Sequence, residues 1–114
     1  MINRYNKNER MSQVVEHNST VILAGQLATD IAADMAGQTQ EILSRVDDLL
    51  AQAGTDKSRL LSATIWVSDM ADFAAMNDVW VGWIDAENPP VRACVRADLI
   101  TPDYRVEIQV TAVK

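Results

Sequence analysis

The order in which hydrophobic periodicity changes along the chain constrains the fold more than any other feature of the sequence. Apolar residues recur at helical spacing in two segments, residues 38–53 and 70–83. Strand-like runs rich in β-branched residues lie at 13–17, 20–24, 60–67, 91–99 and 105–113. The resulting order, β-β-α-β-α-β-β, predicts an α+β fold in which both helices cover one face of a single mixed sheet. The length of 114 residues fits one domain, 1–114.

Turn and cap signals separate these segments. Asn18 and Ser19 lie between the first two strand-like runs, which predicts a hairpin. Residues 25–37 contain two glycines and predict a loop, and Gly54 provides a stop signal for the first helix. Asp69 is a candidate N-cap for the second helix.

The sheet face away from the helices also carries apolar side chains. In the run 60–67, two sets alternate: Leu61, Ala63, Ile65 and Val67 on one side, Leu60 and Trp66 on the other. A domain of this size buries only about two-thirds of the surface that its unfolded chain exposes. Covering the second face with copies of the same chain would stabilise it, so we expect a homo-oligomer.

The charge balance and the few metal-binding side chains exclude several functions. Ten Lys and Arg against sixteen Asp and Glu give a formal net charge of −6, which argues against nucleic acid as the main ligand. Cys94 is the one cysteine, so no internal disulfide can form, and His17 has no second metal ligand at a suitable spacing. We expect no metal and no cofactor. The polar N-terminal segment and the lack of a long apolar run predict a cytoplasmic protein that does not enter membranes.

The last two strand-like runs carry the residues that most suggest chemistry. If 91–99 and 105–113 pair as an antiparallel hairpin, opposite charges meet in a register that sets Arg96 opposite Glu107. Arg92 and Glu107 then share the polar face, offset by roughly 13 Å along the strands at about 3.3 Å per residue. A small ligand would fit between them.

The residue types suit binding and hydrolysis of a small carboxylate. A guanidinium such as that of Arg92 grips a carboxylate with two hydrogen bonds, and Glu107 could deprotonate a water. On spacing alone, an ion pair between Glu107 and Arg96, and a surface or interface role for Arg92, are the better explanations. Gly25 lies at a strand end, where a turn could leave backbone N–H groups free for a ligand or be a plain turn. Cys94 fits a small buried residue better than a reactive thiol.

These residues resemble the signature of the RidA/YjgF family, the reactive-intermediate (enamine/imine) deaminases. "PVRACV" contains Arg92 and Cys94, and Glu107 in "VEIQVTAV" follows the arginine by fifteen residues. The similarity extends to "LAGQ" at 23–26 and to residues 53–77. The resemblance implies a chorismate-mutase-like fold assembled as a homotrimer, with the sheets in a central barrel and ligand clefts between subunits.

The resemblance also implies an activity. Such proteins hydrolyse 2-imino acids, the tautomers of 2-enamino acids, to 2-oxo acids and ammonia, without a metal or organic cofactor. Arg92 would bind the substrate carboxylate, the backbone at Cys94 would help to hold the substrate, and Glu107 would position and activate the attacking water. The turn at Gly25 would line the same cleft. The family's deaminases commonly carry a tyrosine fourteen residues before this glycine, where the present chain has Met11 and therefore a more apolar cleft.

Two other functions compete with deamination. A regulatory or metabolite-binding trimer would keep Arg92 as a carboxylate clamp without turning the ligand over. An endoribonuclease, a label sometimes attached to this family, is disfavoured by the net charge of −6 and by the absence of a histidine pair.

Overall fold

One six-stranded sheet is the scaffold of the computed structural model, which describes all residues from 1 to 114. Its spatial order is β1-β2-β3-β6-β4-β5, and every neighbouring pair is antiparallel except β4 and β5. The strands are β1 (Asn3–Tyr5), β2 (Val14–His17), β3 (Thr20–Leu23), β4 (Leu60–Val67), β5 (Val91–Arg96) and β6 (Val106–Val113). The predicted mixed sheet is confirmed, and β1 is a strand that the sequence pattern did not reveal.

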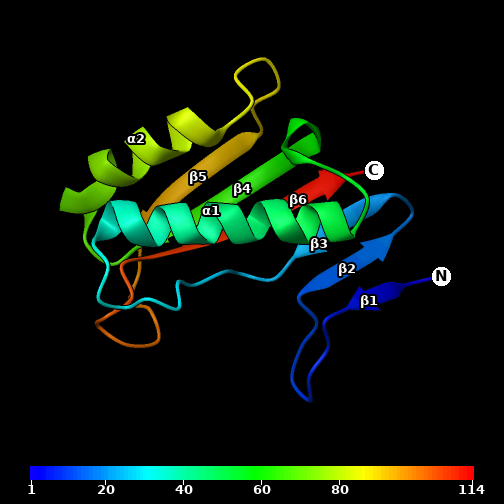
Figure 1. The fold of residues 1–114 in the computed structure, drawn as a ribbon, viewed down its shortest axis with the longest axis horizontal. Helices are drawn as coiled ribbons and strands as arrows, with labels where there is room; N and C mark the ends of the chain where they lie inside the picture. Colours follow the sequence, from blue (N-terminus) through cyan, green and yellow to red (C-terminus); the bar gives the residue numbers. More distant parts are fainter.

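Both helices lie across the same face of this sheet, as predicted (Figure 1). They are α1 (Met35–Gln52) and α2 (Phe73–Trp83), and two single turns of 3₁₀ helix, η1 (Lys57–Arg59) and η2 (Met70–Asp72), precede β4 and α2. The molecule measures 42 × 38 × 20 Å, so its shortest dimension holds one helical layer and one sheet. Neither helix combines the length and apolar character that a membrane span requires.

The helix caps differ in detail from the prediction. α1 begins three residues earlier than expected, because the side chain of Asp34 accepts a hydrogen bond from the Gly37 N–H at 2.9 Å and so caps the helix. Asp69 does cap a helical turn, but that turn is η2, where its carboxylate accepts from the Ala71 N–H.

The hydrophobic core lies between the two layers. The alternation predicted for the last strand is present, since its even-numbered residues are buried and its odd-numbered ones are partly exposed. The buried set in β6 is Val106, Ile108, Val110 and Ala112. These side chains form one cluster with the apolar stripe of α1, which includes Ile42, Val46, Leu49 and Leu50. Each such side chain contributes roughly 1.5–3 kcal/mol by its removal from water.

The hairpin predicted around Asn18 and Ser19 is confirmed. His17 pairs with Thr20, so only two residues connect β2 to β3. Both have positive φ, 49° at Asn18 and 67° at Ser19, as a type I′ turn requires. This turn matches the twist of the strands and fixes their register.

The predicted hairpin between 91–99 and 105–113 is wrong, because β4 lies between the two strands. β4, α2 and β5 form a β-α-β unit, and such a crossover makes its two strands parallel. The segment 97–105 is longer than a tight hairpin turn, and it passes over the end of β4. There, two backbone hydrogen bonds hold it: the Ala97 N–H donates to the Val67 carbonyl, and the Ser68 N–H donates to the Arg105 carbonyl.

The second face of the sheet carries exposed apolar side chains and no helix (Figure 1). Ile22, Leu61, Val91 and Val95 are 44–73% exposed. Leu61 does not share a face with Ala63 as expected, since a register shift between Leu60 and Ser62 buries Leu60 and exposes Leu61. The homo-oligomer that this face suggests stays a prediction.

Candidate functional site

The two predicted catalytic residues lie on opposite faces of the sheet. Arg92 pairs with Ala63, whose side chain is buried under the helices, whereas Glu107 pairs with Trp66 on the uncovered face. From the strand spacing and a three-residue offset, their Cα atoms are about 14 Å apart. The expectation that they share one polar face is therefore wrong, as is the pairing of Glu107 with Arg96. The cause is the strand β4 between them.

Glu107 is held against the backbone of Gly25. A Cβ atom at Gly25 would lie 2.1 Å from Glu107 Oε2 and 3.1 Å from its Cδ, so only glycine leaves room for this carboxylate. Glu107 forms no ion pair within the chain, and burial alone raises the pKa of its carboxyl group above the ordinary 4.5. A partly buried carboxyl group with a raised pKa is suited to exchanging a proton with water.

A β-bulge, rather than the predicted turn, brings Gly25 to this position. β3 and β6 pair Ile22 with Thr111, but further along Gln26 bridges to Ile108, so the β3 side has one residue more. An extra residue reverses the alternation and turns Gly25 to the uncovered face. Its backbone N–H has no acceptor within the chain, and its Cα lies against the carboxylate of Glu107. A residue with an unused backbone donor thus lies next to the carboxylate of Glu107.

Arg92 is held on the helix side by residues of α2. Its Nη1 donates to Asn77 Oδ1 at 2.7 Å, and its Cζ lies 5.5 Å from the ring centre of Trp80 and 5.8 Å from that of Phe73. These contacts restrain the guanidinium but leave other N–H donors exposed for an anion. Phe73 and Trp80 belong to the apolar residues at helical spacing in the segment 70–83, a pattern that predicts packing against the sheet. Asn77 lies on the same helical stripe, which is the one signal that could have indicated it.

Cys94 contributes backbone rather than thiol to this region. Its side chain is half-buried against the core, and burial raises the pKa of the thiol, with Arg92 opposing the shift, so the group is unreactive. β5 is an edge strand that is paired only with β4. The Ala97 N–H donates to the Val67 carbonyl, and alternation along the strand then points the Cys94 N–H toward the free edge.

Met11 lies in the connection between β1 and β2 and is 45% exposed. Two hydrogen bonds to Asn8 hold the backbone of Met11. The Asn8 side chain accepts from the Met11 N–H at 2.9 Å, and the Asn8 N–H donates to the Met11 carbonyl at 2.9 Å. Two residues on, Gln13 contacts the bulge, because its side chain accepts from Gln26 Nε2 and its carbonyl accepts from the Ala24 N–H. The N-terminal segment is therefore joined to the Gly25 side of the molecule.

Two groups of predicted residues emerge. Gly25 and Glu107 meet on the uncovered face, and the N-terminal segment is tied to them. Arg92 and Cys94 lie together on the edge strand β5. No cluster of three or more His, Cys, Asp or Glu residues that could hold a metal is present in the 114 residues.

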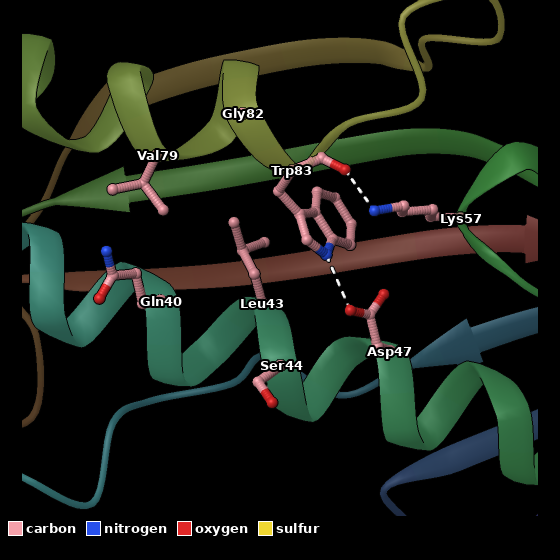
Figure 2. Close-up of a pocket in the computed structure, with 8 residues that line it drawn as sticks. All are labelled: Gln40, Leu43, Ser44, Asp47, Lys57, Val79, Gly82 and Trp83. Atoms are coloured by element: carbon pink, nitrogen blue, oxygen red, sulfur yellow. Dashed lines mark hydrogen bonds between the residues drawn. The ribbon is translucent and has the colours of Figure 1, made fainter.

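The hollows of the single chain do not include this site. A groove of about 310 Å³ runs between α1 and α2 (Figure 2). There, the indole Nε1 of Trp83 donates a hydrogen bond to Asp47 at 3.0 Å. The backbone carbonyl of Trp83 accepts one from Lys57 Nζ at 2.5 Å. Both charged side chains are thus engaged with Trp83, Asp47 with its indole and Lys57 with its backbone carbonyl. A second hollow of about 380 Å³ lies under residues 98–102. The cavity expected between Arg92 and Glu107 is absent from one chain.

Comparison with known proteins gives matches along nearly the whole chain. A family model described as endoribonuclease L-PSP matches residues 1–114. A RutC family protein of Haemophilus ducreyi is 43% identical over 112 residues, which are 98% of this chain and 96% of the relative. The crystal structure of a YjgF family member from Neisseria meningitidis has a TM-score of 0.97 at 40% identity and covers 100% of this chain and 95% of that chain.

A more distant relative has a name that states a reaction. It is a 2-iminobutanoate/2-iminopropanoate deaminase of Salmonella typhimurium, 29% identical over 109 residues, covering 90% of this chain and 85% of the relative.

Proposed function

The chain belongs to the endoribonuclease L-PSP family, the YjgF/RidA family, and we propose that it hydrolyses reactive 2-enamino and 2-imino acids to 2-oxo acids and ammonia. The observation that carries the proposal is the carboxyl group of Glu107. It is partly buried, lacks an ion-pair partner in the chain, has a raised pKa and lies against Gly25, whose N–H has no acceptor within the chain. The deaminase named among its relatives supports the same reaction.

The proposed reaction needs one proton acceptor and one carboxylate clamp. Arg92 binds the carboxylate of the imino acid, and Glu107 takes a proton from a water as its oxygen attacks C2. Glu107 passes this proton to the imine nitrogen, which gives a neutral carbinolamine, and then takes the proton of its hydroxyl group and delivers it to the nitrogen as the C–N bond breaks. One imine and one water give one 2-oxo acid and one ammonia. An imine carbon is already electrophilic, so orientation of the two reactants supplies much of the acceleration.

The separation of the two residues requires a second copy of the chain. Arg92 stands at the free edge of β5 and Glu107 on the uncovered face, about 14 Å apart by strand spacing. We propose that β5 of one copy approaches the uncovered face of the next in a homotrimer, so that each cleft combines Arg92 of one subunit with Glu107 of another. Val91 and Val95, 73% and 45% exposed, would be covered in this contact.

The reaction is tested by ammonia release from freshly generated 2-iminopropanoate or 2-iminobutanoate. We expect Glu107→Gln to lower kcat by about 100-fold or more, and Arg92→Ala mainly to raise KM. Arg96→Ala is the matched control, because Arg96 is an exposed arginine of the same strand without an ion pair. A wild-type rate equal to the uncatalysed rate would refute the proposal.

Mixing two impaired variants, assayed at a substrate concentration well below the KM of Arg92→Ala, tests the shared cleft. When Arg92→Ala and Glu107→Gln chains are unfolded together and refolded in equal amounts, about one quarter of the clefts in a random trimer combine both native residues. We expect about that fraction of wild-type activity. An inactive mixture of correctly assembled trimers would show that the two residues do not share a cleft across subunits.

A carboxylate-binding trimer without turnover is the second candidate. The observation that favours it is the contact of Arg92 with Asn77 and two aromatic rings. These contacts orient the guanidinium for binding a carboxylate, and they do so independently of Glu107. Titration calorimetry with 2-oxobutanoate separates the two functions. A pure binder shows Arg92-dependent binding and no turnover, whereas a deaminase with Glu107→Gln keeps binding and loses turnover.

A further inference from the structure

The bulge between β3 and β6 is closed by the side chain of Gln26. The register shift leaves the Ala24 carbonyl without a backbone donor, and Gln26 Nε2 donates to it at 2.9 Å. The same Nε2 donates to Gln13 Oε1 at 2.9 Å, so both of its protons are used. The residue is only 4% exposed. A buried amide with both donors engaged fixes the local chain path.

The backbone of Gln26 connects this bulge to the strand of Glu107. Its N–H donates to the Ile108 carbonyl at 2.8 Å, and the Ile108 N–H donates back at 3.2 Å. Gly25 precedes Gln26 and Glu107 precedes Ile108 in the chain. The pair of hydrogen bonds between Gln26 and Ile108 therefore lies directly beside the contact between Gly25 and Glu107. A change in the bulge therefore alters the distance between the backbone of Gly25 and the carboxylate of Glu107.

We propose that Gln26 is a positioning residue for the reaction, acting through the bulge that sets Gly25 against Glu107. This inference rests on the proposed function. Gln13 extends the same network to the segment that carries Met11, so the amide of Gln26 joins two walls of the predicted cleft. The role is one of geometry, because the carboxamide exchanges no proton with the substrate.

Three substitutions of similar side-chain length test the role. Gln26→Met keeps the length and removes both donors, leaving two partly buried acceptors, Gln13 Oε1 and the Ala24 carbonyl, without this partner. Gln13→Glu keeps the Oε1 acceptor that Gln26 uses. Gln40→Met makes the same chemical change as the first variant at an exposed position of α1, away from the bulge.

The expected result is a loss of turnover without a loss of binding. Because an ångström of misplacement can cost about 100-fold, we expect Gln26→Met to lower kcat by about 10- to 100-fold and to leave KM within about twofold. Gln13→Glu keeps most of the activity, and Gln40→Met matches the wild type. Unchanged kcat in Gln26→Met overturns the inference, and so does an equal loss in Gln13→Glu. If Gln26→Met does not fold, Gln13→Met, which removes only one acceptor, is expected to lower kcat less, and an unchanged kcat overturns the role.

Amide exchange separates this inference from the proposed function. A wild-type protein without turnover refutes the deaminase, but the exchange rate of the Ile108 N–H still reports on the bulge. Faster exchange at Ile108 in Gln26→Met than in Gln40→Met supports the positioning role of the amide, and equal exchange overturns it.

Discussion

Replacing Gly25 by alanine displaces the carboxylate of Glu107 without removing it. The new Cβ would lie 2.1 Å from Oε2, and ordinary contact begins at 3.4 Å, so the oxygen must retreat by 3.4 − 2.1 = 1.3 Å. The atom in the way is the end of a flexible side chain, which can move. The φ angle of Gly25 is not positive, unlike that of Gly54, so alanine can adopt the same backbone conformation. Gly25→Ala should therefore fold, with a loss of stability of at most about 1–3 kcal/mol.

The expected effect falls on the chemical step. A misplacement of about 1 Å costs roughly 100-fold in rate, which equals about 2.7 kcal/mol in the activation barrier. Ammonia release from 2-iminopropanoate should show this loss in kcat, with KM within about threefold of the wild type because Arg92 still binds the substrate. Thermal unfolding of the same samples separates misplacement from misfolding.

Gly82→Ala is the matched control for this experiment. No atom lies within 4 Å of a Cβ at Gly82, and the residue is inside α2, where alanine is favoured over glycine by up to about 1 kcal/mol. This variant should have a slightly higher Tm and the wild-type kcat. A wild-type kcat in folded Gly25→Ala would refute the reasoning, since the carboxylate would then act from some other position.

Three further predictions concern the hydrogen bonds of Glu41 and Arg92 and the ionisation of Glu107. The hydroxyl and backbone N–H of Thr29 hold the pKa of Glu41 at about 2, below the ordinary 4.5, so this stabilisation is present above pH 4.5 and is lost as the pH falls toward 2. Glu41→Gln should lower the free energy of unfolding in urea by about 1–2 kcal/mol at pH 7, and the difference from wild type should vanish near pH 2. Asn77→Ala should raise KM about three- to tenfold with little change in kcat, because Arg92 loses its restraint; a change confined to kcat in the same steady-state assay would contradict this. Because burial raises the pKa of Glu107 and the base must be ionised, kcat/KM should fall on the acid side with a midpoint above pH 4.5, and Glu107→Gln should abolish that limb of the pH–rate profile.

Local patterns predicted the elements well and their arrangement less well. The limits of β4 and the hairpin at Asn18 depend on residues close in sequence, and both were predicted correctly. β1 was missed because its three residues, Asn3–Tyr5, have no apolar alternation and form a strand only by pairing with β2. The predicted fold class was correct although the pairing of the last two strands was wrong, because any order of these strands gives one sheet beneath two helices.

The error in the site has one physical origin. Alternation within each strand was predicted correctly: Arg92, Cys94 and Arg96 pair with helix-facing residues of β4, and Glu107 lies on the side opposite to Ile108. Alternation says nothing about how the faces of two separate strands match. Charge pairing between 91–99 and 105–113 supplied a plausible register, but the insertion of β4 depends on the β-α-β crossover, which no local pattern encodes.

The placement of Arg92 and Glu107 on different surfaces has a consequence for assembly. A two-fold dimer brings a patch together with the same patch of its partner, whereas a ring brings together two different patches. Arg92 belongs to the edge of β5 and Glu107 to the uncovered face, and the contact that we propose, in which the edge of β5 of one copy meets the uncovered face of the next, is of the second kind. Such a contact closes only as a cyclic assembly of three or more copies or continues as a fibre. The trimer expected from the family resemblance is the smallest closed assembly with such a contact, and in it Arg92 of one copy would meet Glu107 of the next.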